Sequence, residues 1–196
     1  MWLFGCAVFT GILILAAPFD LDVSQRYYDS ANSWAIWVRY WGTMPNVLLY
    51  GAAVIYLVFP RLRRRSILLQ VIAVTILLMA LLHPLLMTQS IKLLWGRLRF
   101  VELQGDWSIF TPFYMINKPF ASESFPSGHV ASACVFLPIG FFLFRAGLAK
   151  AALILFASTA FWAALIAYAR IVAGAHYLTD TIFSIGSSLL LAPLSA

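Results

Sequence analysis

Six long apolar segments constrain the fold more than any other feature of this sequence. A membrane-spanning helix needs about 20 mostly apolar residues, and six stretches of the chain meet or approach that length. They are residues 1–19, 40–60, 66–88, 128–144, 151–168 and 176–194. We therefore expect an all-α, polytopic membrane protein, a bundle of about six transmembrane helices that forms a single membrane-embedded domain over residues 1–196.

Composition excludes the main alternatives to a membrane protein. The chain is 63% hydrophobic and 10% charged, whereas soluble domains are about 45–50% apolar and about 25% charged. An ordinary soluble domain and a nucleic-acid-binding protein are both excluded. The first apolar segment, residues 1–19, carries no charge and lacks the basic start and small-residue cleavage site of a signal peptide. We expect this segment to remain as a helix.

The distribution of Lys and Arg predicts the orientation of the chain. The loops 61–65 and 145–150 are basic and contain no acid, whereas all seven Asp and Glu residues lie on the other side of the expected bundle. Cytoplasmic loops carry an excess of Lys and Arg. We therefore expect a multi-pass protein of the cell (inner) membrane with both termini in the cytoplasm. Residues 89–125, between spans three and four, should form a short helical and loop region facing the periplasm or exterior.

Three polar clusters lie at the outward ends of spans three to six. In the first, Lys92 and Arg99 are seven residues apart and would share one face of a continuous helix. Interfacial anchoring is the simpler explanation for these two residues when the cluster is taken alone. Arg97, off that face, is expected to meet lipid headgroups.

The second cluster is Pro126-Ser127-Gly128-His129, at the start of an apolar segment. Pro and Ser favour helix starts, and the free backbone N–H groups there can bind an anion. Gly128 lets a phosphate approach the backbone, and His129 is placed to donate a proton to a leaving group. A capped helix with an incidental histidine is an equal alternative for this cluster alone.

The third cluster contains Arg170, His176 and Asp180. His176 and Asp180 are four residues apart and would share one helical face. A carboxylate beside an imidazole fixes its tautomer and supports positive charge, leaving the other ring nitrogen as a nucleophile or base. A structural His–Asp pair is the alternative. Ionisable residues at membrane depth are costly, which favours a functional role.

Together, the three clusters indicate phosphate chemistry. Three cations, a helix start and two histidines on one side of the membrane suit an oxyanion with three or more oxygens. Phosphoryl transfer needs positioning, charge neutralisation, a nucleophile and a proton donor. No carboxylate pair or histidine cluster is spaced to hold a metal.

These clusters resemble the type-2 phosphatidic acid phosphatase (PAP2) superfamily of membrane lipid phosphatases. The family pattern reads K-x6-R-P, then P-S-G-H, then S-R-x5-H-x3-D. The matching residues are Lys92 and Arg99, Pro126 to His129, and Arg170, His176 and Asp180. Phe100 stands where the family usually has Pro, and Ala169 stands where it usually has Ser. Both departures affect supporting positions, so the resemblance still implies an active enzyme.

The resemblance implies a role for each matched residue. His176 would attack phosphorus to form a phosphohistidine, Asp180 would orient and charge-balance His176, and His129 would protonate the leaving group and later activate water. The residues expected to hold the phosphate oxygens are Lys92, Arg99, Ser127, Gly128 and Arg170. No metal and no cofactor is implied.

The sequence therefore predicts a metal-independent membrane phosphohydrolase of phospholipid metabolism, with a lipid phosphate or diphosphate as substrate. The candidates are phosphatidylglycerophosphate or phosphatidate, undecaprenyl diphosphate, and lipid A. The expected partners are this substrate and membrane lipids, with no nucleic acid and no obligate protein partner. Two alternatives stay open: a lipid phosphotransferase that uses the same phosphohistidine, and a phospholipid transporter or scaffold without turnover.

Overall fold

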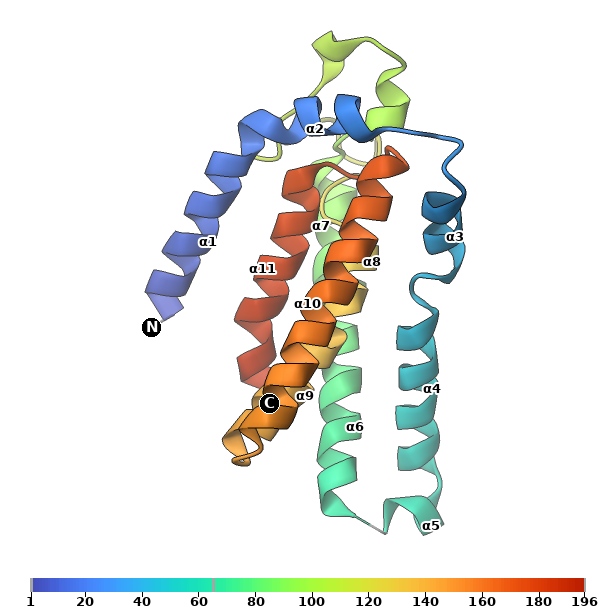
Figure 1. Cartoon of the computed structure of the whole chain (residues 1–196), viewed down its shortest axis with the longest axis vertical. Coiled ribbons are helices and arrows are strands. Elements are labelled where there is room, and N and C mark those ends of the chain that lie inside the picture. The colour runs from blue at the N-terminus through green and yellow to red at the C-terminus, as the bar shows by residue number, and fades with distance from the viewer. Residues whose placement is uncertain (1, 65, 196) are drawn as a thin grey trace.

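The protein is an all-helical bundle whose passes alternate in direction (Figure 1). The computed structural model describes residues 2–64 and 66–195, so Met1 of the first expected span, Arg65 of the expected basic loop and Ala196 of the expected domain lie outside it. Within the described part of the chain, five helices are long and apolar enough to cross a membrane, and the segment Leu178–Leu194 is slightly shorter. The expected polytopic α-helical architecture is confirmed.

Short 3-10 and π segments, labelled η, interrupt several of the passes. The elements in chain order are α1 (Trp2–Ala16), η1 (Ala17–Phe19), α2 (Asp20–Tyr27), α3 (Ser33–Trp41), α4 (Met44–Val58), α5 (Pro60–Arg63), α6 (Ile67–Ala80), η2 (Leu81–Met87), α7 (Thr88–Trp95), η3 (Phe100–Leu103), η4 (Trp107–Ile109), α8 (Gly128–Ala133), η5 (Cys134–Phe136), α9 (Leu137–Arg145), α10 (Ala149–Val172) and α11 (Leu178–Ser195).

The first helix is an integral part of the bundle. Helix α1 packs along α11, where the rings of Phe9 and Phe183 lie 5.8 Å apart between centroids. A Cβ atom on Gly186 would lie 2.1 Å from the Phe9 ring, so the missing side chain lets the two helices approach closely. At its far end α1 continues through η1 into α2, which lies across the end of the bundle (Figure 1).

The second pass begins earlier than expected. The sequence predicted a span over 40–60, but α3 begins at Ser33, where the Asn32 side chain accepts a hydrogen bond from Ala35 N at 3.0 Å. This N-cap satisfies an otherwise unpaired backbone N–H. The chain bends at residues 42–43 and continues as α4. Arg39 therefore lies on a helix of the bundle.

The third pass is continuous from α6 through the π segment η2 to α7. Pro84 lies inside η2 and has no N–H to donate, which disrupts the regular helical hydrogen-bond pattern. The adjacent His83 is buried, with its Nε2 atom 2.8 Å from Ser187 Oγ. Burying a polar ring requires such a partner, and this one fixes the third pass against α11.

The remaining passes surround a buried apolar core. Helices α10 and α11 both pack against α8 and α9, and α3 packs against α10. Fully buried aliphatic side chains, including Val130 and Ile166, fill the space between them. The outer faces carry exposed side chains such as Leu3 and Phe161, which is the arrangement that a surrounding lipid phase favours.

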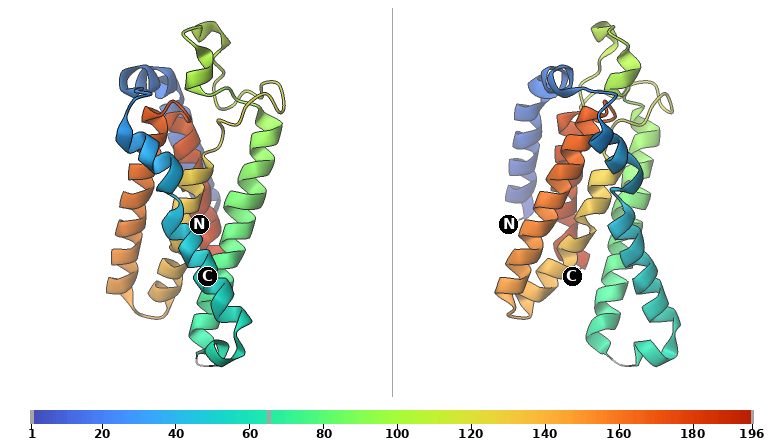
Figure 2. Two further views of the ribbon diagram at one scale, coloured as in Figure 1. Left: turned by 90° about the vertical axis from the view of Figure 1, so that its right-hand side faces the viewer. Right: turned by 45° about the vertical axis from the view of Figure 1, so that its right-hand side comes forward.

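The two ends of the bundle differ in what they carry. The basic loops after α4 and α9 lie at the same end, toward which both chain termini point, and residues 96–127 fold over the opposite end (Figure 2). Arg145 donates to the Pro193 carbonyl at 3.1 Å, which places the end of α11 beside the second basic loop. All three sequence clusters lie at the other end, around the starts of α8 and α11.

Candidate active site

Lys92 and Arg99 converge on one point, but they do not share a helix. Helix α7 ends at Gly96, whose φ of 59° is left-handed and whose added Cβ would lie 1.9 Å from Lys118 O. The expectation of a shared helical face is therefore wrong, because only glycine fits this turn and the turn ends the helix first. Lys92 Nζ lies 3.9 Å and Arg99 Nη2 lies 3.8 Å from the same oxygen, Oε2 of Glu123. This carboxylate oxygen marks a position where both cations can hold an anion.

Ser127 and Gly128 adjoin the same position. Ser127 is the N-cap of α8, and its Oγ is buried with no hydrogen-bond partner in the described part of the chain. A Cβ built on Gly128 would lie 4.0 Å from Lys92 Cε. The Ser127 N–H donates to the Asp180 carbonyl at 3.3 Å, which ties the second cluster to the third. The expected helix start at Gly128 is confirmed.

Arg170 lies in the last turn of α10 and directly adjoins the loop that carries His176. The N–H groups of Ala175 and His176 both donate to the Arg170 carbonyl, at 3.0 and 3.3 Å. The guanidinium is buried, and neither its Nε nor its Nη1 finds a partner among the described residues. Buried donors left unpaired cost free energy. With Arg99 Nε and Ser127 Oγ they form a set of donors that an oxyanion would satisfy.

His176 precedes α11 and is held mainly by the backbone. Its Nδ1 lies 2.5 Å from the Ser124 carbonyl oxygen and 3.7 Å from Asp180 Oδ2. Nδ1–H therefore donates to Ser124, which leaves Nε2 unprotonated as a nucleophile or base. Burial lowers the pKa of His176 to about 3, and the charge of Arg170 acts in the same direction. The imidazole is neutral over the physiological range.

Asp180 acts on His176 through Ser124. Its Oδ2 accepts hydrogen bonds from Ser124 Oγ at 2.6 Å and from the Tyr177 N–H at 2.8 Å. Its Oδ1 accepts from Arg97 Nη1 at 2.5 Å. The carboxylate thus fixes the segment whose carbonyl orients the imidazole, and it lies close enough to offset a positive charge on the ring.

Arg97 is the residue that sequence analysis placed wrongly. It is fully buried, with its guanidinium 4.1 Å from the centroid of the Tyr177 ring and Nη2 donating to Asp20 Oδ2 at 2.8 Å. It does not face lipid headgroups, because the left-handed turn at Gly96 redirects the chain inward. Thr179 completes the cluster by donating to Asp20 through both N–H and Oγ1, at 2.8 and 2.5 Å. The sequence signal for this was Gly96, because a glycine can end a helix, and residues after that end do not follow its faces.

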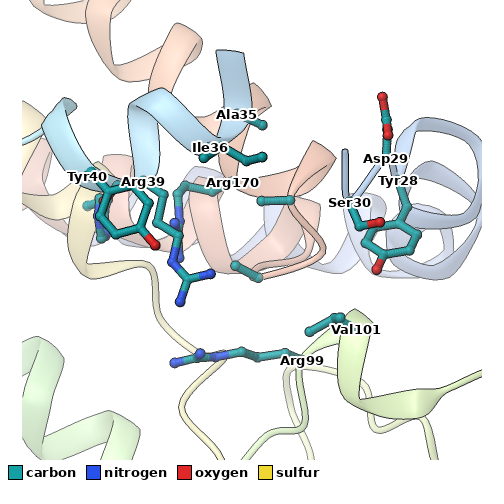
Figure 3. Close-up of a pocket in the computed structure, with 13 residues that line it drawn as sticks. Tyr28, Asp29, Ser30, Ala35, Ile36, Arg39, Tyr40, Arg99, Val101 and Arg170 are labelled. Atoms are coloured by element: carbon teal, nitrogen blue, oxygen red, sulfur yellow. The ribbon is translucent and has the colours of Figure 1, made fainter. Parts of the chain in front are cut away.

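His129 lines two cavities. Its Nε2 lies 3.2 Å from the Arg39 carbonyl oxygen, so Nδ1 is the nitrogen free to exchange a proton with a bound group. The first cavity, about 370 Å³, is lined by His129 and by three arginines, at positions 39, 99 and 170 (Figure 3). The second, about 340 Å³, is lined by His129, Lys92, Glu123 and Asn46. Both volumes fall in the range of small-ligand sites, about 300–1,000 Å³.

The structure thus brings the expected residues of all three clusters to one end of the bundle. The Ser124, Arg97 and Asp20 side chains and Arg39 were not anticipated as parts of the site. Within residues 2–64 and 66–195, no three His, Cys, Asp or Glu side chains are grouped to hold a metal ion.

Comparison with known proteins gives two findings. The sequence profile described as the PAP2 superfamily matches residues 67–196. The chain is also similar to a solved structure, the first transmembrane PAP2-type phosphatidylglycerolphosphate phosphatase from Bacillus subtilis. The identity is 23% and the TM-score 0.57, over 97% of this chain and 93% of that chain. At this identity the likeness supports the fold alone. No curated protein matches the sequence.

Proposed function

Because the chain belongs to the PAP2 superfamily, we propose that it is a metal-independent lipid phosphatase that works through a phosphohistidine. One observation carries the proposal. Buried donors of Ser127 and Arg170 lack partners in the described structure, and they adjoin a neutral histidine whose Nδ1–H is already bound. An anion held by these donors would face a free imidazole nitrogen, which is the arrangement that in-line phosphoryl transfer needs.

The reaction proceeds in two displacements. Nε2 of His176 attacks phosphorus, and the bond to the lipid oxygen breaks as that oxygen takes a proton from Nδ1 of His129, which starts protonated on both ring nitrogens. Arg99, Lys92 and Arg170 neutralise the charge that accumulates on the phosphoryl oxygens. Neutral His129 then removes a proton from water, the oxygen attacks phosphorus, and the N–P bond of the phosphohistidine breaks. Inorganic phosphate leaves and both histidines regain their starting protonation states.

The substrate is a lipid phosphate or diphosphate reached from the membrane surface. The site lies at one end of the bundle, next to lipid-facing helices, and among the described residues only 96–127 fold over that end (Figure 2). A substrate anchored by acyl or prenyl chains can present its phosphate at this depth. The basic loops at the opposite end support a cytoplasmic location for that end and for both termini, with the site at the outer face of the cell membrane.

The whole chain forms the catalytic domain in this proposal. Asp20 lies before the range matched by the family profile, yet it bonds Arg97 and Thr179 beside the catalytic Asp180. The end of the first pass therefore contributes Asp20 to the surroundings of the site, which supports a single domain over residues 1–196.

The test is phosphate release from defined lipids. The purified protein in detergent micelles with EDTA is given phosphatidate, phosphatidylglycerophosphate, undecaprenyl diphosphate or lipid A, and free phosphate is measured against the His176→Ala variant. We expect release from at least one lipid and none from the variant. Absence of release from every lipid would contradict the proposal and favour a transporter. Transfer of radiolabelled phosphate to an added lipid alcohol in preference to water would identify a phosphotransferase.

A further inference from the structure

Arg39 is a cation at this site that belongs to none of the three sequence clusters. It lies on α3, and its side chain lines the cavity beside Arg170, with Arg99 on the other side (Figure 3). No carboxylate in the described part of the chain lies within 4.0 Å of either Arg39 or Arg170. The Arg39 guanidinium instead lies 5.7 Å from the centroid of the Tyr40 ring.

The charge around this cavity exceeds what one phosphate neutralises. A phosphate monoester carries about −1.5 to −2 near neutral pH. Arg99 and Arg170 already supply two positive charges in this cavity, whereas Lys92 and the Glu123 carboxylate line the second one. Asp29 also lines the cavity, but its Oδ1 accepts from the Ala31 N–H at 3.0 Å, and it lies at the far end from the arginines (Figure 3). Arg39 therefore adds a positive charge that the reacting phosphate does not require.

The second cavity offers less positive charge to an anion other than the reacting phosphate. It contains the Glu123 carboxylate and the buried Asn46 amide, with Lys92 as its cation. An additional negative group on the substrate is thus better placed in the arginine-lined cavity. Guanidinium groups bind phosphate oxygens through two parallel hydrogen bonds, which suits Arg39 to this group.

We propose that Arg39 is a specificity-determining residue that binds a second phosphate of the substrate, so that the protein prefers lipids carrying two phosphate groups. This inference rests on the proposed function. The three cations of the sequence clusters hold the phosphate that reacts, and Arg39 holds the one that does not. Two of the candidate lipids carry their phosphates close together, whereas in lipid A a disaccharide separates them. In a prenyl diphosphate the two phosphates are adjacent, and in phosphatidylglycerophosphate a glycerol separates them.

The experiment compares substrate selectivity between matched arginine variants. Each protein is assayed on phosphatidate, phosphatidylglycerophosphate and undecaprenyl diphosphate in the same micelles, and kcat/KM is expressed relative to phosphatidate. The variants are Arg39→Gln, Arg39→Lys and, as control, Arg26→Gln. Arg26 is also exposed and lies over the ring of the next residue, Tyr27, at 5.8 Å, but it does not line the cavity. Substituting the Arg39 side chain keeps the main-chain carbonyl that contacts His129.

We expect Arg39→Gln to lower the selectivity for a two-phosphate lipid by about tenfold, mainly through KM, since tenfold corresponds to one lost charge-assisted contact. Arg39→Lys should retain part of the selectivity, and Arg26→Gln should match the wild type. The lipid whose relative kcat/KM falls shows which spacing of the two phosphates the site binds. An unchanged ratio in Arg39→Gln, or an equal loss with all three lipids, would overturn the inference.

A binding measurement separates this inference from the proposed function. The His176→Ala variant, with and without Arg39→Gln, is titrated with each lipid while intrinsic tryptophan fluorescence is recorded. If a two-phosphate lipid binds more tightly and this difference depends on Arg39, the inference is supported, even when the wild type releases no phosphate. Absence of phosphate release would then contradict only the proposed phosphatase activity. Equal affinities for one-phosphate and two-phosphate lipids would overturn the inference and leave the phosphatase intact.

Discussion

Arg97 and Asp180 form a hydrogen-bonded ion pair of 2.5 Å in which neither side chain is exposed. The same guanidinium bonds Asp20, so one cation holds two carboxylates that come from opposite ends of the sequence. A buried charge is tolerated only when it is paired and hydrogen-bonded. The pair therefore links the end of the first pass and the start of the last one directly to the residues around His176.

Replacing Arg97 by Met should strongly destabilise the protein. It leaves the buried carboxylates of Asp20 and Asp180 without their cation, and breaking a buried pair costs about 3–5 kcal/mol. Thermal unfolding in detergent, followed by tryptophan fluorescence, measures the effect, with Arg26→Met as the exposed control. Adding Asp20→Asn to Arg97→Met should cost less than the sum of the two single changes, because it removes one unpaired charge. Strict additivity would contradict this account of the network.

Replacing Ser127 by Ala should lower the activity of the protein without lowering its stability. The Ser127 hydroxyl is buried without a partner in the described residues, so its removal leaves Tm equal or higher. Loss of one donor to the phosphoryl oxygens lowers kcat by about 10²–10³ if the donor acts as an oxyanion contact does. The matched control is Ser184→Ala, whose equally buried hydroxyl donates to the Asp180 carbonyl at 2.9 Å. A lower Tm with full activity in Ser127→Ala would show that the serine is structural.

His176 should remain neutral well below the usual range of histidine. Burial lowers the pKa of this imidazole to about 3, compared with about 6.5 in an unfolded chain. NMR spectra of the ¹⁵N-histidine-labelled protein, with His176 assigned from the His176→Ala variant, should show no titration of this ring between pH 8 and 4.5. A midpoint near pH 6.5 would contradict the neutral nucleophile. The circular dichroism spectrum should stay constant over the range as a control for folding.

The same pKa difference predicts how acid affects stability. The unfolded chain binds a proton on His176 below about pH 6.5, whereas the folded protein binds it only near pH 3. The contribution of the neutral His176 imidazole to the free energy of unfolding is therefore complete above pH 6.5 and is lost as the pH falls toward 3. His176→Asn should therefore lose less Tm than the wild type between pH 7 and 4.5. Parallel pH dependences in the two proteins would exclude this linkage.

Chelators should leave the reaction unchanged, and orthovanadate should inhibit it. In the proposed reaction, charge neutralisation comes from Lys92, Arg99 and Arg170, and no step passes through a metal. Vanadate adopts the five-coordinate geometry of phosphorus in transfer, and transition-state analogues bind more tightly than substrates. Phosphate release is measured with and without EDTA, and across a vanadate titration. Loss of activity in EDTA that added Mg²⁺ restores would refute this mechanism.

Sequence alone determined the parts of this protein that depend on local pattern. Six apolar segments specify membrane helices because lipid leaves backbone groups no partner except each other. The spaced residues of the three clusters identified the superfamily, and the helix start at Gly128 followed from Pro126 and Ser127.

Tertiary structure decided how the site is held together. Arg97 turns inward because the left-handed Gly96 ends α7, and only the packing of α1 against α11 brings Asp20 to it. Ser124 holds the imidazole of His176 from 52 residues away in the chain, and Arg39 reaches the cavity because α3 begins before the expected span. A charge this deeply buried needs a partner, and the sequence does not reveal which one, because the choice is made by backbone turns and helix contacts between residues far apart along the chain.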